Sequence, residues 1–318
     1  MIGIGAVYLL AGAVFAAVAL FSAADRGNAK RLANAAFWAL FAVSFLFGDV
    51  LGDFANGVLV LAMVGIAGTV GLGVGRPSTT APEERRALAR KFGNTIFVPA
   101  LAIPTVTLAG SFALKTITVG GRALFDPAQS TLISLALGAM VALALARMLL
   151  RQTVTHALQE GRKLMDLLGW AALLPQMLAA LGAVFALAGV GRAIGSLAAE
   201  AIPTDSRFAA VLAYTCGMAI FSAIMGNAFA AFPVMTAGIG LPLIVMKFGG
   251  NPAIACAIGM LSGFCGTLTT PMAANFNLVP AALLGLEDRY AVIKAQVPTA
   301  LMMLLVNTVL MYALVFRF

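Results

Sequence analysis

The sequence predicts an all-α polytopic membrane protein of about eight to ten helices, arranged as two repeat halves with re-entrant hairpins and broken helices. The chain has 318 residues, of which 62% are hydrophobic and 10% are charged, and its mean hydropathy is +1.01. Soluble proteins carry about 25% charged residues. The apolar runs are continuous and rich in Ala and Leu, whereas the strands of a membrane barrel alternate apolar and polar residues.

Residues 1–150 form the first predicted repeat, which begins with three apolar spans at residues 2–21, 32–47 and 54–75. The first span has no basic segment ahead of it, so we expect a retained helix rather than a cleaved signal peptide. The third span is rich in glycine. We expect it to pack closely against other helices, because small residues let helix backbones approach each other in lipid.

A re-entrant hairpin is predicted near residues 92–125. Pro99 and Pro104 lie five residues apart in the apolar run 92–114. A regular helix cannot hold two such prolines without freeing backbone carbonyls. The prolines therefore favour a chain that turns back within this run.

The orientation of the two repeats is open at this point. Cytoplasmic loops carry an excess of Lys and Arg, which places the loops at 26–31, 76–91 and 147–163 in the cytoplasm. If 92–114 is a hairpin, three crossings separate the halves, as an inverted repeat requires, but the loops 76–91 and 147–163 then face opposite sides. If 92–114 crosses the membrane once, there are four crossings and the repeats are parallel.

Residues 151–318 form the second predicted repeat, with a hairpin near 226–248 and a broken helix near 251–285. Lys247 is the one Lys, Arg, Asp or Glu between residues 208 and 286, yet Gly, Pro, Asn and Thr interrupt this stretch repeatedly. Non-helical backbone at membrane depth must be buried in protein or line a cavity. Broken helices with amides and hydroxyls at the breaks are typical of a solute site in a transporter.

An internal repeat relates the two halves. The Gly-Asn pair at 93–94 opens an apolar run that Pro99 interrupts, and the pair at 226–227 opens another that Pro233 interrupts. Each Asn can cap a helix N-terminus, whose partial positive charge attracts anions, and the preceding Gly lets backbone approach a ligand. Matched interrupted segments in two halves indicate the binding site of a secondary transporter.

The candidate substrate-binding residues are the glycines, amides and hydroxyls at these breaks, which offer donors and acceptors without a charged side chain. They are Gly93, Asn94, Thr95, Ser130, Thr131, Gly226, Asn227, Thr267, Thr269, Thr270, Asn275 and Asn277. The competing interpretation is interhelical hydrogen bonding that only packs the bundle, worth about 0.6 kcal/mol per bond. No cofactor or metal centre is predicted, and any coupling ion is expected to be Na⁺ held by neutral oxygens.

Catalysis and a purely structural role are the alternatives to transport. His156 is the only histidine and lies in a basic loop, so a Ser–His pair or a histidine metal site has little to build on, and no catalytic residue is predicted. A structural or accessory subunit of a membrane complex stays open. The net charge of +8 is spread over short loops, which predicts contact with a lipid bilayer and anionic lipid rather than nucleic acid.

A family resemblance is carried by Met-Gly-Asn-Ala-Phe-Ala-Ala-Phe-Pro at 225–233, by Gly-Thr-Leu-Thr-Thr-Pro-Met-Ala-Ala-Asn-Phe-Asn at 266–277, and by residues 93–111. With these segments the chain resembles the domain-of-unknown-function 979 family over nearly its whole length. The resemblance implies a bacterial inner-membrane protein, one subunit of a two-subunit 5-oxoproline (pyroglutamate) permease, with a second membrane subunit as partner.

The same resemblance implies distant kinship with the ion-transporter superfamily, whose paired Asn- and Thr-bearing hairpins surround carboxylate and Na⁺. The residue after Asn is Thr95 in the first half but Ala228 in the second. This departure from the pattern puts the Na⁺ sites of that superfamily in doubt for this chain.

Overall fold

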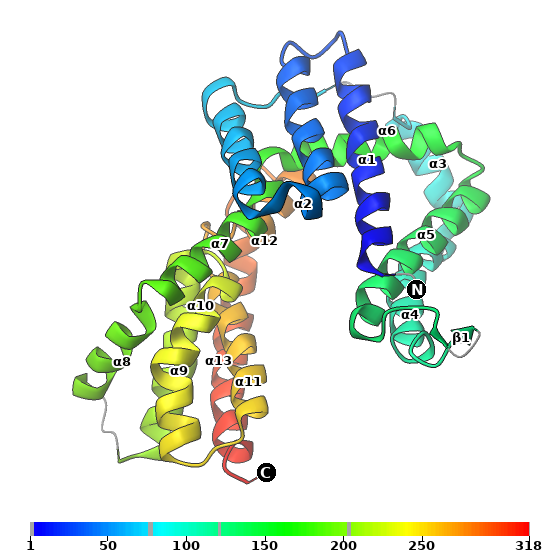
Figure 1. Cartoon of the computed structure of the whole chain (residues 1–318). Helices are drawn as coiled ribbons and strands as arrows, with labels where there is room; N and C mark the ends of the chain where they lie inside the picture. The colour runs from blue at the N-terminus through cyan, green and yellow to red at the C-terminus, as the bar shows by residue number, and fades with distance from the viewer. Residues whose placement is uncertain (1–2, 76–78, 120–121, 202–204, 318) are drawn as a thin grey trace. The chain divides into compact units, whose positions relative to one another are not determined.

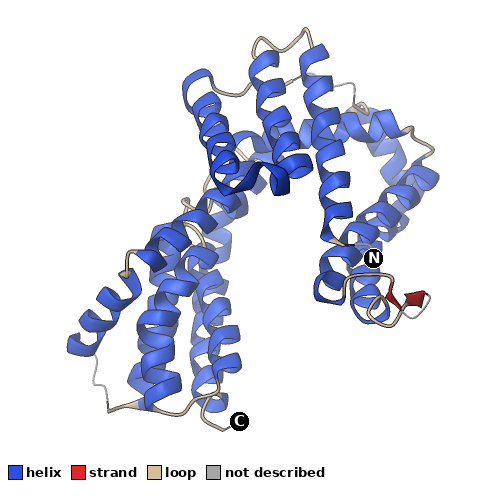
Figure 2. Cartoon of the chain, in the orientation of Figure 1, coloured by secondary structure: helices blue, strands red, loops and turns tan. Residues whose placement is uncertain are grey.

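The computed structural model describes residues 3–75, 79–119, 122–201 and 205–317. Most of these residues are helical (Figures 1 and 2), and the described part holds one pair of two-residue antiparallel strands, β1 (Thr118–Val119) and β2 (Arg122–Ala123). Eight helical segments of the described chain are long and apolar enough to cross a membrane. The prediction of an all-α polytopic membrane protein is therefore confirmed.

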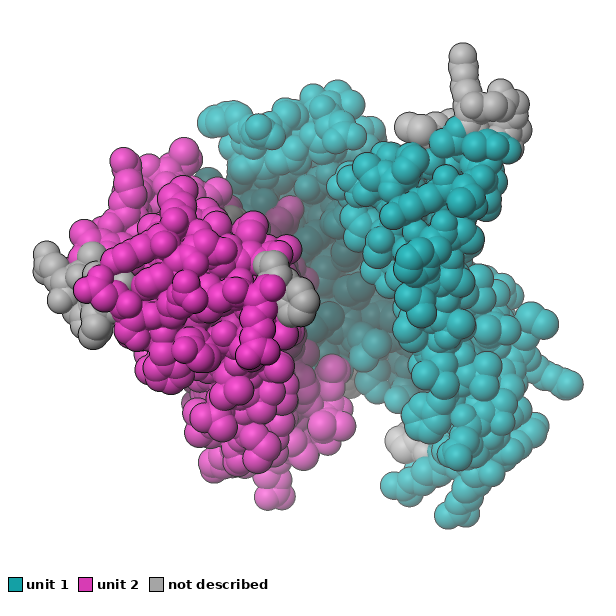
Figure 3. Space-filling model, turned by 90° about the horizontal axis from the view of Figure 1, so that it is seen from below, with its two compact units in different colours: residues 1–169 teal, residues 170–318 magenta. Residues whose placement is uncertain are grey.

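The chain forms two compact units, residues 1–169 (unit 1) and residues 170–318 (unit 2), which Figure 3 colours separately. Unit 1 contains α1 (Ile4–Ala24), α2 (Arg31–Gly65), α3 (Pro82–Phe92), α4 (Phe97–Ala113), α5 (Ser130–Leu150) and α6 (Val154–Leu168). Unit 2 contains α7 (Leu174–Leu187), α8 (Val190–Ala201), α9 (Arg207–Met225), α10 (Ala228–Met235), α11 (Pro252–Thr267), α12 (Ala274–Leu283) and α13 (Ala291–Leu314). The predicted sequence repeats, 1–150 and 151–318, stay a prediction.

Aromatic rings hold α1 against α2. Phe15 stacks on Trp38, with ring centroids 5.8 Å apart, and on Phe41, with centroids 5.1 Å apart. Trp38 is 1% exposed and Phe41 is 5% exposed, so these rings form the centre of the contact. Such pairs add about 0.5–1.5 kcal/mol beyond the area they bury.

The second and third predicted spans form one long element, α2, that is interrupted at Gly52. Gly52 has a φ of 71°, a left-handed conformation that favours glycine. A π-helical turn, Ile66–Val70, continues α2. The close packing expected for the glycine-rich span is not found in its helical part, because a Cβ on Gly57 or Gly65 would meet no described atom within 4 Å.

The glycines at 71–75 instead lie over a buried polar cluster. The Asn34 amide donates to the Gly73 carbonyl at 2.6 Å, and the Gly73 N–H donates back to Asn34 Oδ1 at 2.9 Å. Asn34 also donates to Asp166 Oδ1 at 3.0 Å, and Arg162 forms an ion pair with Asp25. Small residues are needed here so that extended backbone can reach polar side chains.

The hairpin expected near 92–125 is misplaced, because α4 runs as a single helix through both prolines. Pro99 is the third residue of α4, where its missing N–H would have no partner within the helix. Pro104 lies inside the helix and removes one hydrogen bond without ending it. The chain turns back only after α4, through β1 and β2, and returns as α5 packed against α4.

Contacts within unit 1 place two basic loops on the same side. The Thr80 N–H donates to Glu160 Oε1 at 2.8 Å, and Arg85 forms an ion pair with Glu160 Oε2 at 2.6 Å. Thr80 and Arg85 of the first basic segment therefore lie beside Glu160 of the second, as a single crossing by α4 followed by a return through α5 requires. The preference for a hairpin at 92–114 is wrong, and the single-crossing alternative fits the structure.

The core of unit 2 lies between α9, α11, α13 and a helical segment that continues α10. Its fully buried side chains include Tyr214, Met218, Ile244 and Met311. The Tyr214 hydroxyl lies 2.8 Å from Thr236 Oγ1, so the buried phenol has a hydrogen-bond partner. This apolar core, with the Tyr214 hydroxyl paired, gives the unit a frame for the helix breaks.

The hairpin expected near 226–248 is also misplaced. Residues 228–247 form one continuous helical segment, α10 followed by the π-helix Thr236–Lys247. In a π-helix each N–H bonds to the carbonyl five residues back, and Pro242 removes one such bond without ending the segment. The chain breaks at 226–227 and again at 248–251.

Candidate functional site

The break between α9 and α10 is made by a Gly-Asn pair. Gly226 ends α9 with a φ of 73°, and Asn227 is the N-cap of α10. Asn227 Oδ1 accepts a hydrogen bond from the Phe229 N–H at 2.7 Å. Asn227 is only 5% exposed, and its Nδ2 group donates to no described atom. The prediction that Asn227 starts a helix is confirmed, and its amide N–H groups remain available.

The break between α11 and α12 spans residues 268–273, inside the predicted broken helix at 251–285. Its threonine hydroxyls are already engaged locally. Thr267 Oγ1 donates to the Phe264 carbonyl at 2.7 Å, Thr269 Oγ1 donates to the Gly266 carbonyl at 2.8 Å, and Thr270 Oγ1 accepts from the Met272 N–H at 3.2 Å. We expected hydroxyls exposed for a ligand, but their hydrogen bonds stabilise the end of α11 instead.

Asn277 holds this second break closed. Its Nδ2 donates to the carbonyls of Thr267 at 2.9 Å and Thr270 at 2.6 Å, which are backbone acceptors left over where α11 ends. Asn277 is fully buried, and its Oδ1 has no hydrogen-bond partner among the described residues. Asn275, two residues earlier, is half-buried and makes no hydrogen bond within the described chain. The unpaired Oδ1 of Asn277 is a buried acceptor, and leaving it without a partner costs about 1–3 kcal/mol of folding free energy.

The two breaks adjoin in space. A Cβ on Gly226 would lie 2.6 Å from the Met272 carbonyl oxygen and 2.9 Å from its Cβ. Gly263 is equally crowded, since a Cβ there would lie 3.0 Å from Ala228 Cβ and 3.0 Å from Ser222 Oγ. Unit 2 therefore brings Gly226, Asn227 and the segment 267–277 to one place.

Ser222 is a polar residue of this region that sequence reasoning missed. It is fully buried, and its hydroxyl has no partner in the described part of the chain. The signal that could have found it is a lone serine one helical turn before the Gly-Asn pair, in an uncharged stretch.

The first-half residues are arranged differently. Gly93 ends α3 with a φ of 50°, and Asn94 and Thr95 lie in the 3₁₀ turn Gly93–Ile96 that leads into α4. Asn94 is exposed, and α4 begins without a side-chain cap, so the prediction that Asn94 starts a half-helix is wrong. The physical reason is that helical backbone continues through residues 94–96, leaving no extended residue whose side chain could cap.

Ser130 and Thr131 do not join Asn94 and Thr95 within unit 1. Thr95 lines a hydrophobic cavity of about 310 Å³ with Val98, Pro99, Leu145, Met148 and Leu149, near the C-terminal end of α5. Ser130 and Thr131 begin α5. At 1.5 Å per residue, the 21 residues of α5 separate its two ends by about 30 Å.

The polar groups at the paired breaks of unit 2 are uncharged. In the described chain no group of three or more His, Cys, Asp or Glu side chains is placed to hold a metal ion. A carboxylate there would meet amide N–H groups and the N-terminus of the helical segment 228–247, which carries partial positive charge. A cation would meet neutral carbonyl and amide oxygens.

Comparison with known proteins matches one protein family. The model of the family described as "Protein of unknown function (DUF979)" matches residues 5–316. No curated protein and no solved structure matches the chain.

Proposed function

The chain belongs to the DUF979 family, and from that membership and its paired helix breaks we propose that it is the transport subunit of a secondary carrier for a small carboxylate. Its place would be the bacterial cytoplasmic membrane, and 5-oxoproline is the substrate that the family resemblance implies. A second membrane subunit would complete the permease. No enzymatic role is proposed.

The observation that carries this proposal is the approach of Gly226 to Met272, where two interrupted helices meet in unit 2. Irregular backbone inside a membrane protein is tolerated where it is buried or lines a cavity. Transporters place such breaks at the substrate site, with half-helix N-termini directed at anionic groups. A packing role alone would not call for two breaks at the same place.

Asn227 is the residue best placed to bind the substrate. Its Oδ1 holds the N-cap, which fixes the orientation of the amide, and its Nδ2 hydrogens are unused. These hydrogens and the N-terminus of α10 would hold the carboxylate. The other candidates of unit 2 would shape the site from the break between α11 and α12. The candidates of unit 1 stay a prediction.

Asn277 would bind a coupling cation. Its Oδ1 is a buried neutral acceptor, the kind of hard oxygen that suits Na⁺. Movement of the paired breaks relative to the rest of the protein would give alternating access. The π-helix Thr236–Lys247 follows α10 directly, and π-helical turns occur often at functional sites.

The test is uptake of radiolabelled 5-oxoproline into proteoliposomes, with and without the partner subunit and an inward Na⁺ gradient. Asn227→Ser keeps an N-cap oxygen but removes the amide donors. We expect uptake to fall about tenfold or more, because a charge-assisted hydrogen bond is worth about 1.5–3 kcal/mol.

Asn251→Ser is the matched control. Asn251 is the N-cap of α11, where its Oδ1 accepts from Ala253 and Ile254 N–H groups at 2.9 and 3.3 Å, at the opposite end of that helix from the break. We expect this variant to keep its uptake. Equal uptake by both variants and the native protein, with the complex assembled, would favour a non-transporting accessory subunit instead.

A further inference from the structure

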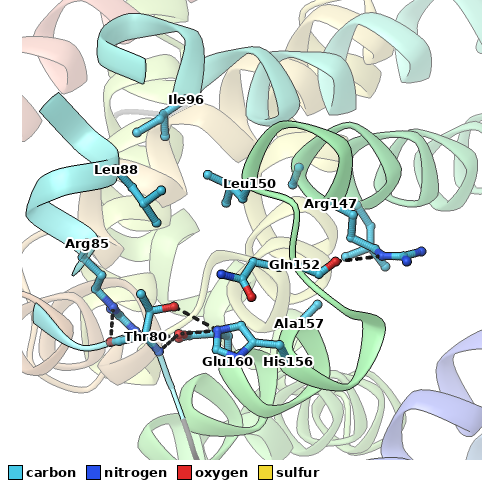
Figure 4. Close-up of a pocket in the computed structure, with 12 residues that line it drawn as sticks. Thr80, Arg85, Leu88, Ile96, Arg147, Leu150, Gln152, His156, Ala157 and Glu160 are labelled. Carbon is cyan, nitrogen blue, oxygen red and sulfur yellow. Dashed lines mark hydrogen bonds and ion pairs between the residues drawn. The ribbon is translucent and has the colours of Figure 1, made fainter. Parts of the chain in front are cut away.

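A cavity of about 380 Å³ in unit 1 is lined by both polar and apolar side chains (Figure 4). Residues of α3, the end of α5 and the start of α6 surround it. Neither the helix breaks of unit 2 nor the proposed carrier site uses these residues. The cavity is large enough for part of a lipid-sized molecule.

One side of this cavity is apolar. Leu88 and Ile96 lie across it from Leu150 (Figure 4). Leu143 and Ala146 of α5 also line the cavity, so α3, the turn Gly93–Ile96 and α5 together supply a hydrocarbon wall. These side chains sit between α3 and α5 without closing the space. A small polar solute would not bury these apolar side chains favourably, whereas an acyl chain would cover them.

The other side of the cavity is polar, and its one acidic side chain among the described residues, Glu160, is already paired with a cation. Glu160 accepts from the Thr80 N–H at 2.8 Å and pairs with Arg85 at 2.6 Å. His156 Nε2 lies 2.9 Å from Thr80 Oγ1. Arg85 therefore balances Glu160, and this pair adds no net charge.

Arg147 is the unbalanced charge at this cavity. Its Nε donates to the Gln152 carbonyl at 3.4 Å, a long contact, and no carboxylate among the described residues pairs with it. Figure 4 places Arg85 and Arg147 on opposite flanks of the cavity. A guanidinium in the last turn of an apolar helix, beside a hydrocarbon wall, suits an anion that carries an acyl chain.

We propose that this cavity is a binding site for an anionic phospholipid, with the phosphodiester on Arg147 and an acyl chain against Leu88, Ile96 and Leu150. The basic segments 79–91 and 147–163 meet here, and anionic lipid is attracted to basic segments at the cytoplasmic surface. The site is independent of the proposed carrier function.

The test is native mass spectrometry of the purified full-length protein with phosphatidylglycerol and, separately, phosphatidylcholine of the same chain length. We expect phosphatidylglycerol to be retained preferentially. Arg147→Gln should lower its retention about tenfold, the effect of one charge-assisted hydrogen bond. Arg147→Lys should keep most of it, because the charge remains.

Arg151→Gln is the matched control, because Arg151 belongs to the same loop but does not line the cavity. Equal losses for Arg147→Gln and Arg151→Gln would overturn the site in favour of general attraction to the loop. Ala146→Phe fills the apolar side and should lower retention without changing charge; unchanged retention in this variant would also overturn the proposal. Displacement of the lipid by inorganic phosphate or glycerol phosphate would show a free-anion site and overturn the assignment to lipid.

Discussion

Gly226 lies against Met272 so closely that a Cβ on the glycine would be 2.6 Å from the methionine carbonyl oxygen. The two residues are separated by 46 positions (272 − 226) and belong to different helix breaks. Their contact brings the N-cap of α10 beside the end of α11. Every functional argument about unit 2 rests on this approach.

Gly226→Ala is expected to destabilise unit 2 strongly. A left-handed conformation costs an L-residue about 1–2 kcal/mol, and the added methyl would also overlap Met272 backbone, which cannot move like a flexible side chain. Gly249→Ala provides the control, because Gly249 has a φ of 68° but open space at its Cβ. Thermal unfolding in detergent should show a clearly larger loss for Gly226→Ala. Equal losses would mean that only the backbone conformation matters, and that the close approach does not.

Asn277→Ala is expected to open the break between α11 and α12. The substitution leaves the carbonyls of Thr267 and Thr270 without their donor, and each unsatisfied buried group costs about 1–3 kcal/mol. Hydrogen exchange of residues 264–277, followed by mass spectrometry, should become faster. Asn275→Ala removes a half-buried amide with no hydrogen bond in the described chain, and exchange should stay as in the native protein. Unchanged exchange in Asn277→Ala would show that the break is held by other contacts.

The two Gly-Asn pairs show how far sequence reasoning reaches. Helix class and membrane character follow from composition alone, and both pairs do mark places where one helix ends. Yet Asn227 caps α10 from an extended conformation with a φ of −156°, while Asn94 continues a 3₁₀ turn. Local sequence is nearly the same in the two cases. The difference lies in packing. The break at Gly226 and Asn227 is buried against the break between α11 and α12, and no local sequence pattern reveals this contact.

The prolines of α4 also show the limit of a local pattern. Pro99 and Pro104 are compatible with one helix because the first falls in its opening turn. The buried charges of unit 1 were missed because Arg162 and Asp25 are 137 residues apart and each belongs to a loop that looks exposed in the sequence. Long-range pairing of this kind becomes visible only in the fold.

Arg162→Ala is expected to destabilise unit 1. Arg162 is 2% exposed and pairs with Asp25 and, at 3.6 Å from Nε, with Asp166. Removing one partner of a buried ion pair costs about 3–5 kcal/mol, because the remaining charge has no compensation. Lys163→Ala removes the neighbouring positive charge, which makes no ion pair in the described structure, and should change the unfolding temperature little. A similar small change for Arg162→Ala would show that the cluster is not buried in the assembled protein.

A second measurement separates charge from packing at this cluster. Asp166→Asn in the Arg162→Ala background removes one of the two carboxylates that lose their cation. It should recover part of the lost stability, because a neutral amide costs less to bury than an unpaired carboxylate. If the double variant is less stable than Arg162→Ala, the loss comes from packing rather than from uncompensated charge.

A single crossing of the membrane by α4, which its length and composition allow, predicts a definite labelling pattern. Single cysteines would be introduced at Arg86, Thr116 and Thr155, all exposed, in a background with the three native cysteines replaced. Arg86→Cys precedes α4, Thr116→Cys follows it, and Thr155→Cys follows the return through α5. An impermeant maleimide added to sealed vesicles should therefore label Arg86→Cys and Thr155→Cys from one side and Thr116→Cys from the other. Labelling of Arg86→Cys and Thr116→Cys from one side and of Thr155→Cys from the other would restore the re-entrant hairpin, because a chain that turns back within residues 92–114 brings residue 116 to the face of residue 86 and α5 then carries residue 155 across.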